Sequence, residues 1–153
     1  MMFEFDLQVD QIEFDHQIIE QAAKKAARKP IEEALTSVEQ RMLSRLQPGS
    51  GPSRPGDSPN VHVSANAGLR DIMLAYDSQA QTGVVGSVLH NDSGSEQPLP
   101  GLLEDGGTTT IRHKKNGKKR RVRIAPRPYA GPSFDDAIQA GEIAGPWEGE
   151  ITG

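Results

Sequence analysis

Apolar and polar residues alternate at the start of the chain. Phe3, Phe5, Leu7 and Val9 occupy every second position, and acidic or amide residues stand between them. A period of two is typical of a β-strand with one apolar face. We therefore expect residues 1–14 to form either a short strand or an extended arm that lies on another subunit.

From Asp15 onward the apolar period becomes that of a helix. Asp15 is a suitable N-cap. Pro30 has no backbone N–H and disfavours helical geometry at the residue before it. The pattern therefore predicts, over residues 15–46, either one kinked helix or two helices with Pro30 at the first position of the second. The apolar residues at helical spacing are Ile18, Ile19, Ala22, Ala23, Ala26, Ala27, Ile31, Leu35, Val38, Met42, Leu43 and Leu46.

A segment rich in Pro and Gly follows this helical region. Residues 47–60 contain four Pro and three Gly and have almost nothing to bury. This composition predicts an extended linker on the surface.

Two β-hairpins are predicted beyond the linker. Residues 72–76 alternate, and Val-rich residues 84–89 return after a polar turn, with Gly86 at a bulge or a close contact. A short helix over residues 69–76 is the alternative for the first strand. The second hairpin joins residues 108–111 to residues 120–124, with Val122 and Ile124 on one face and Arg121 and Arg123 on the other. Its centre, Asn116-Gly117, suits a type I′ turn.

Short helical segments flank the second hairpin. Residues 102–105 are expected to form a short helix or a turn. A last helix is predicted over residues 134–143, with Ser133 as N-cap and Asp135 and Asp136 in its first turn.

Together these elements predict an α+β fold. We expect one domain over residues 15–142, with the 47–60 linker inside it and a C-terminal extension over residues 143–153. The long kinked helix would pack on a mostly antiparallel sheet of about four strands that includes a basic hairpin. The short last helix and extended terminal arms complete this expectation.

Composition indicates a small core and excludes some chemistry. Hydrophobic residues make up 35% of the 153 residues and aromatic residues 5%, so we expect stabilisation by neighbouring copies or partners. The chain has no Cys, which rules out disulfides, a thiolate nucleophile and a Cys-based zinc site. No apolar run is long enough to cross a membrane, so no membrane partner is expected.

Charge is concentrated in the second hairpin, although the whole chain has a net charge of −4. No acid interrupts its eight cations. They could contact the phosphates of DNA, but no aromatic residue stands among them for base stacking. A solvated hairpin tip, or docking on an acidic surface of a partner, is the favoured interpretation. These cations are Arg112, Lys114, Lys115, Lys118, Lys119, Arg120, Arg121 and Arg123.

No residue pattern predicts an enzyme. The four His are widely spaced, and no Ser stands in a strand–turn–helix motif. Glu104 and Asp105 are adjacent, which is poor geometry for an acid/base couple on a strand. We therefore expect no catalytic residue, no metal site and no cofactor.

Four segments, read in order, resemble a known family. They are GLRDIMLAYD from Gly68, TGVVGSV from Thr82, PGLLEDGGT from Pro100 and APRPYAGPSFDDA from Ala125. Their order is similar to that of tailed-bacteriophage tail-component proteins of the virion-morphogenesis and tail-completion type. The residues that match the family's two most distinctive motifs are Leu103, Glu104, Gly106, Gly107 and Thr108, and then Arg127, Pro128, Tyr129, Pro132 and Phe134. Asp105 and Tyr129 stand where that family usually has Phe.

The resemblance implies a non-enzymatic structural protein of the phage neck, joining head and tail in the virion. It implies a homo-oligomeric ring, six- or twelve-fold, next to portal or adaptor proteins and to tail-tube or terminator proteins. A tail terminator ring, or a small DNA-binding accessory protein that uses the basic hairpin, is the alternative. Because two Pro flank Arg127, we also expect its side chain to anchor a carboxylate, with Glu104 as the candidate.

Overall fold

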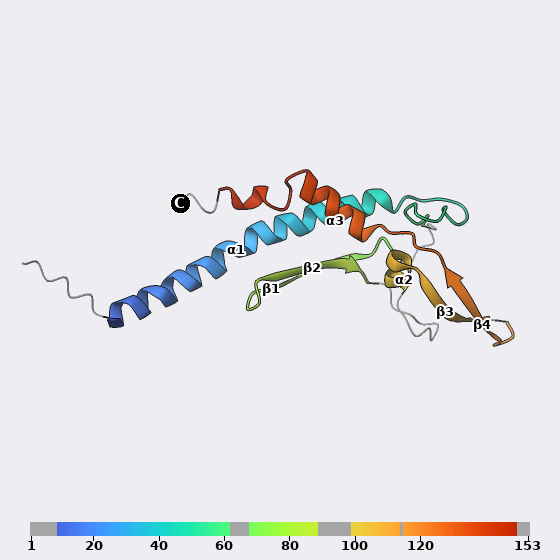
Figure 1. Cartoon of the computed structure of the whole chain (residues 1–153), viewed down its shortest axis with the longest axis horizontal. Helices are drawn as coiled ribbons and strands as arrows, with labels where there is room; N and C mark the ends of the chain where they lie inside the picture. The colour runs from blue at the N-terminus through green and yellow to red at the C-terminus, as the bar shows by residue number, and fades with distance from the viewer. Residues whose placement is uncertain (1–8, 62–67, 89–98, 114, 150–153) are drawn as a thin grey trace, which may run out of the picture.

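A computed structural model of the chain describes residues 9–61, 68–88, 99–113 and 115–149. One long helix, α1, runs from Val9 to Arg45 (Figure 1). It begins six residues before Asp15, so residues 9–14 are helical. The strand or arm expected over residues 1–14 is therefore wrong for residues 9–14, and residues 1–8 lie outside the described residues. Pro30 stands inside α1, so the two-helix alternative is wrong. Pro30 is fully buried, and this packing compensates for the backbone hydrogen bond that it cannot make.

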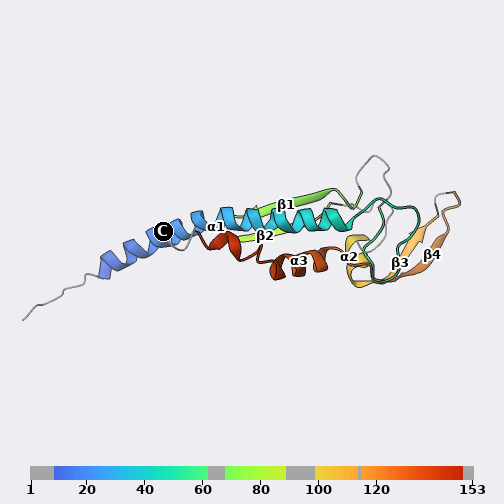
Figure 2. The same cartoon turned by 90° about the horizontal axis from the view of Figure 1, so that it is seen from above.

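The four strands form two separate antiparallel ribbons rather than one sheet. Strand β1 (Ile72–Asp77) pairs with β2 (Thr82–Ser87), and β3 (Gly107–Arg112) pairs with β4 (Lys119–Ile124). The helix expected as an alternative over residues 69–76 is wrong, since this segment forms β1. Helix α1 packs on the β1–β2 ribbon, while the β3–β4 ribbon extends from the other end of the molecule (Figures 1 and 2).

Three short helical elements complete the α+β fold. Helix α2 spans Leu99–Asp105, α3 spans Ala130–Gln139, and the 3-10 helix η1 spans Gly145–Trp147. α3 and η1 both pack against α1, so the residues after α3 lie along the body of the protein. Helix α3 begins at Ala130, which is before the predicted start.

The core is small and lies where the C-terminal half of α1 meets the rest of the chain. Tyr129, Met42 and Leu46 are the largest fully buried apolar side chains. The cluster contains Val38, Met42, Leu46, Val61, Leu69, Leu103, Tyr129 and Ala137. This size agrees with the lean apolar composition of the chain.

The Pro- and Gly-rich segment is docked on the body rather than simply spanning the surface. Pro59 is buried. The Gly56 N–H donates to the Pro126 carbonyl over 2.9 Å, and the Ser58 hydroxyl donates to the Pro128 carbonyl over 3.2 Å. A single parallel bridge joins Pro48 to Val61. The segment supplies backbone partners to a neighbouring Pro-rich stretch that cannot form a regular ladder.

Two ion pairs join α1 to the region of α3. Arg41 donates two hydrogen bonds to the Glu142 carboxylate, over 2.7 and 3.0 Å, and Arg45 pairs with Asp136. The hydrogen bonds from Arg41 hold the pKa of Glu142 below its ordinary value. Asp136 was expected to stabilise the start of α3, but α3 begins earlier and this carboxylate pairs with Arg45 instead.

The N-terminal part of α1 projects beyond the body (Figure 1). All side chains from His16 to Lys25 are exposed. Ile18 and Ile19 are 50% and 67% exposed, although they belong to the apolar pattern of the helix. Nothing among the described residues covers this apolar face.

Candidate functional site

The two segments that carry the family resemblance meet at the start of α3. Glu104, at the end of α2, accepts hydrogen bonds from three successive backbone N–H groups. The donors are Tyr129 at 2.7 Å, Ala130 at 2.5 Å and Gly131 at 3.2 Å. The first turn of any helix has N–H groups without partners inside the helix, and a carboxylate there is further stabilised by the helix dipole. Glu104 therefore caps α3 from a distant part of the chain.

Ser133 is not the N-cap that the sequence suggested. It lies inside the first turn of α3, is fully buried, and its hydroxyl donates to the Tyr129 carbonyl over 2.5 Å. Tyr129 occupies the cap position, where its own side chain makes no capping bond. The expected first-turn role of Asp135 and Asp136 is also wrong, because Glu104 holds that position.

Arg127 does not anchor Glu104. Its guanidinium donates to the carbonyls of Ser53 and Ala125, over 3.0 and 3.2 Å. Its backbone N–H donates to the Leu103 carbonyl over 2.6 Å. The carboxylate of Glu104 binds backbone N–H groups instead, because these already converge at the helix start. Arg127 thus ties the docked 47–60 segment to the motif, and Pro128 beside it is half-buried.

Gly106 joins α2 to β3, and Gly107 is the first residue of β3. Their φ angles are +71° and +150°, a region that side chains rarely adopt. A Cβ on Gly106 would also lie 2.9 Å from Cδ of Pro126. Thr108 is exposed, whereas Thr109 is buried. The two glycines allow the LEDGGT and APRPY segments to approach closely.

Tyr129 is the buried centre of this junction. Its side chain is 1% exposed, and its hydroxyl lies 2.7 Å from Oγ of Ser87 on β2. The Ser87 hydroxyl has one proton and donates it to the Leu69 carbonyl over 2.6 Å. The Tyr129 hydroxyl is therefore the donor to Ser87. Burial raises the pKa of Tyr129 above its ordinary value. Pro132 is half-buried, while Phe134 is 47% exposed.

The basic hairpin carries its charge mainly on one face. The register places Arg112, Lys119, Arg121 and Arg123 on the same side of the β3–β4 ribbon, with Thr108 and Thr110. Val122 and Ile124 lie on the opposite face and are half-buried, as predicted. Lys115 and Lys118 lie in the loop, Arg120 is on the opposite face, and Lys114 lies outside the described residues. All seven described cations are exposed, and the ion pairs of the described residues include none of them.

The turn of this hairpin is not type I′. That turn needs two central residues with positive φ, whereas only Gly117 has one, at +65°. The backbone N–H of His113 donates to the Lys118 carbonyl over 2.9 Å, and the backbone N–H of Gly117 donates to the His113 carbonyl over 2.9 Å. The turn is therefore wider than predicted.

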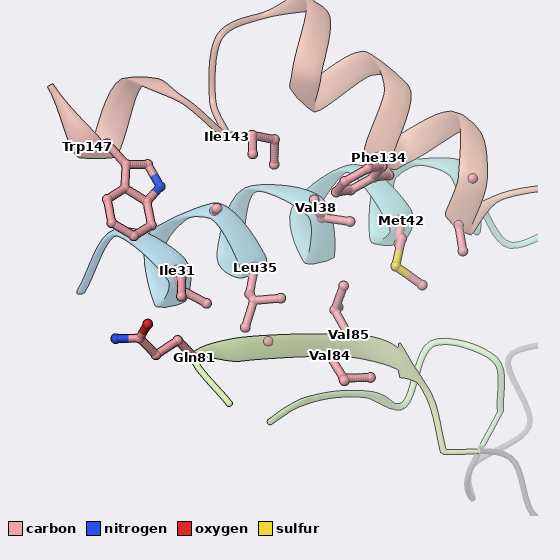
Figure 3. A pocket seen from close by; sticks show the side chains of 14 residues that line it. Ile31, Leu35, Val38, Met42, Gln81, Val84, Val85, Phe134, Ile143 and Trp147 are labelled. Atoms are coloured by element: carbon pink, nitrogen blue, oxygen red, sulfur yellow. The ribbon is translucent and has the colours of Figure 1, made fainter. Parts of the chain in front are cut away.

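An apolar groove lies between α1, β2 and the C-terminal region (Figure 3). Its volume is about 630 Å³, and Gln81 is the only residue of its lining with a polar amide. Val38 and Met42 line it from α1, and Phe134 and Trp147 from α3 and η1. No signal in the sequence pointed to this groove, because it forms from segments far apart in the chain.

The described residues contain no cluster of His, Asp or Glu suited to a metal ion. In the same part of the chain, no helix combines the length and apolarity needed to span a membrane. Comparisons with protein-family models, with curated proteins and with solved structures found no match to this chain.

Proposed function

We propose that the chain is a structural subunit of the neck or upper tail of a tailed bacteriophage. It would assemble as a six- or twelve-fold homo-oligomeric ring that joins head and tail, as a tail-completion or head–tail connector protein. The observation that carries this proposal is the projecting part of α1, whose exposed Ile18 and Ile19 a neighbouring subunit would cover.

The rest of the subunit supports the same proposal. The core is small, and each ribbon has two strands with open edges. An isolated two-stranded ribbon is marginal in water, so contact with neighbours would stabilise the β3–β4 ribbon, on which no helix of the described residues packs extensively. A subunit completed by its neighbours is what a closed ring requires.

The motif junction supports the link to the phage family. The residues that match its two motifs lie in contact, since Glu104 binds the backbone of Tyr129, Ala130 and Gly131. These residues build the scaffold that connects α2, α3 and the β3–β4 ribbon. Within this class, a tail terminator ring is the alternative position.

The basic face of the β3–β4 ribbon favours a second candidate function, which is DNA binding. Its four cations and those of the loop have no acidic partner among the described residues. In a neck ring such a face would meet either an acidic surface of the next ring or the DNA that passes through the channel. As a separate accessory protein, the chain would bind duplex DNA without sequence preference.

Native mass spectrometry of the purified full chain over a range of concentrations tests the ring. We expect a closed species of six or twelve subunits that grows with concentration. A chain that remains monomeric throughout, yet binds DNA tightly at low salt, would favour the accessory protein instead.

A further inference from the structure

The apolar groove coincides with the place of a missing strand. Helix α1 covers the β1–β2 ribbon, and α3 lies beside α1 on the side of β2 (Figures 1 and 2). A third strand on the free edge of β2 would therefore lie beneath α3, in the groove. We propose that residues 3–8 of a second copy bind there as this third strand.

The edge of β2 is ready for such pairing. β2 pairs with β1 on one side, and no other described strand pairs with it. In an antiparallel ladder, alternate residues direct their N–H and C=O groups away from the partner strand. An extended segment that adds to such an edge gains backbone hydrogen bonds, and pockets beside the edge select its side chains.

The pattern of residues 3–8 matches the two sides of this position. Phe3, Phe5 and Leu7 would share one face of the added strand, and Glu4 and Asp6 the other. The first face would enter the groove, whose walls are aliphatic and aromatic. The second would point to solvent on the side of Val84, which is 66% exposed and points away from α1 (Figure 3).

The length of α1 requires the strand to come from another copy. Ile31 is the first residue of α1 that lines the groove, and it lies about 33 Å along the helix from Val9. The stretch from Phe3 to Val9, fully extended, reaches only about 20 Å. Residues 3–8 therefore cannot occupy the groove of their own chain while α1 is intact.

This contact is directional, because the arm of one copy meets the groove of the next. A heterologous contact of this kind builds rings or open chains rather than isologous dimers. This contact between copies rests on the proposed ring, but it can be tested separately from the ring.

Disulfide trapping tests the contact, since the natural chain contains no Cys. One full-length variant carries Asp6→Cys, which leaves Phe3, Phe5 and Leu7 in place. Its partner carries Val84→Cys on the solvent-facing side of β2, which Asp6 would share. We expect the mixed pair to form a cross-linked dimer under mild oxidation. The matched control partner carries Met73→Cys, since Met73 is 59% exposed and lies on the same face of the ribbon but on β1.

At least tenfold faster cross-linking to Val84→Cys than to Met73→Cys supports the contact. Adding Phe5→Asp to the Asp6→Cys chain should remove this preference. Equal rates for the two partners, or a preference that survives Phe5→Asp, would overturn it. A chain carrying both Asp6→Cys and Val84→Cys should form intermolecular bonds, and an intramolecular bond would refute the assignment to a second copy. Rings that form normally with Phe5→Asp would overturn the contact and leave the ring standing.

Discussion

At the scale of single residues, the junction depends on one carboxylate and one phenol. Glu104 replaces the side-chain cap that α3 does not find in its own sequence. Tyr129 links the start of α3 to β2 through Ser87. The two residues are separated from their partners by long stretches of chain, so they fix the tertiary arrangement rather than a local turn.

Replacing Glu104 by Ala should lower the free energy of unfolding by about 1–3 kcal/mol, because three N–H groups lose their acceptor. Glu104→Gln should cost less, since the amide oxygen still accepts. Denaturant unfolding measures both. Asp105→Ala is the matched control, because its exposed side chain contacts none of these groups, and it should change stability little. Equal losses for Glu104→Ala and Asp105→Ala would contradict the capping role.

Stability should fall at alkaline pH because of Tyr129. Its pKa is raised in the folded protein, so the fold favours the protonated phenol. This contribution is fully present below the ordinary pKa of tyrosine, near 10, and is lost as pH rises through the folded value. Thermal unfolding between pH 8 and 11 measures it. Tyr129→Phe should cost about 1 kcal/mol at neutral pH and show a smaller alkaline loss. An unchanged alkaline loss would assign the effect to other groups.

At the scale of elements, α1 and β2 approach each other at a glycine. A Cβ on Gly83 would lie 2.6 Å from Cδ1 of Leu35 and 2.8 Å from Cγ2 of Ile31. Gly86, which the sequence suggested as the close contact or bulge, has open space around it and keeps the regular register opposite Met73. The groove floor therefore depends on Gly83.

Gly83→Ala should destabilise the protein by about 1–3 kcal/mol, because the side chains of Ile31 and Leu35 must shift to admit the methyl group. Gly86→Ala adds the same atoms to the same strand without a contact, so it should have little effect. Denaturant unfolding of the two variants provides the comparison. A loss for Gly86→Ala as large as that for Gly83→Ala would contradict the observed packing.

Periodicity identified most elements, but not their partners. The spacing of Ile31, Leu35 and Val38 predicted α1, and the alternation around Val122 predicted β4, because both patterns are local. Three other features depend on which distant segments come into contact. They are the separation into two ribbons, the capping of α3 by Glu104 and the groove. Ser133 and Arg127 had plausible local roles that nonlocal partners replaced. The Pro-rich segment looked like a free linker because its hydrogen bonds involve backbone groups, which composition does not reveal.

At the scale of the whole molecule, the basic ribbon and the exposed Ile18 and Ile19 are at opposite ends. The basic ribbon extends from one end of the body, and the part of α1 that carries Ile18 and Ile19 projects from the other (Figure 1). In a ring this separation would let α1 and the groove join neighbouring subunits, while the ribbon meets a polyanion or an acidic ring. Changes on the ribbon should therefore affect polyanion binding, and changes on α1 or in the groove should affect assembly.

Removing charge from the ribbon should weaken polyanion binding without affecting assembly. The variant with Lys115, Lys118 and Lys119 changed to Gln should lose most of its affinity for duplex DNA, and the affinity of the natural chain should fall steeply with salt. Fluorescence anisotropy with a labelled duplex measures the affinity of the variant and the salt dependence of the natural chain. Native mass spectrometry gives the assembly state. No binding by the natural chain at low salt would leave an acidic protein surface as the partner of the ribbon.

Cryo-electron microscopy of particles assembled with the full chain tests the proposed function most directly. We expect a closed ring of six or twelve copies at the head–tail junction, with the projecting part of α1 in contact with the next subunit. Particles that assemble completely and contain no copy of the chain at the neck or upper tail would contradict the proposal.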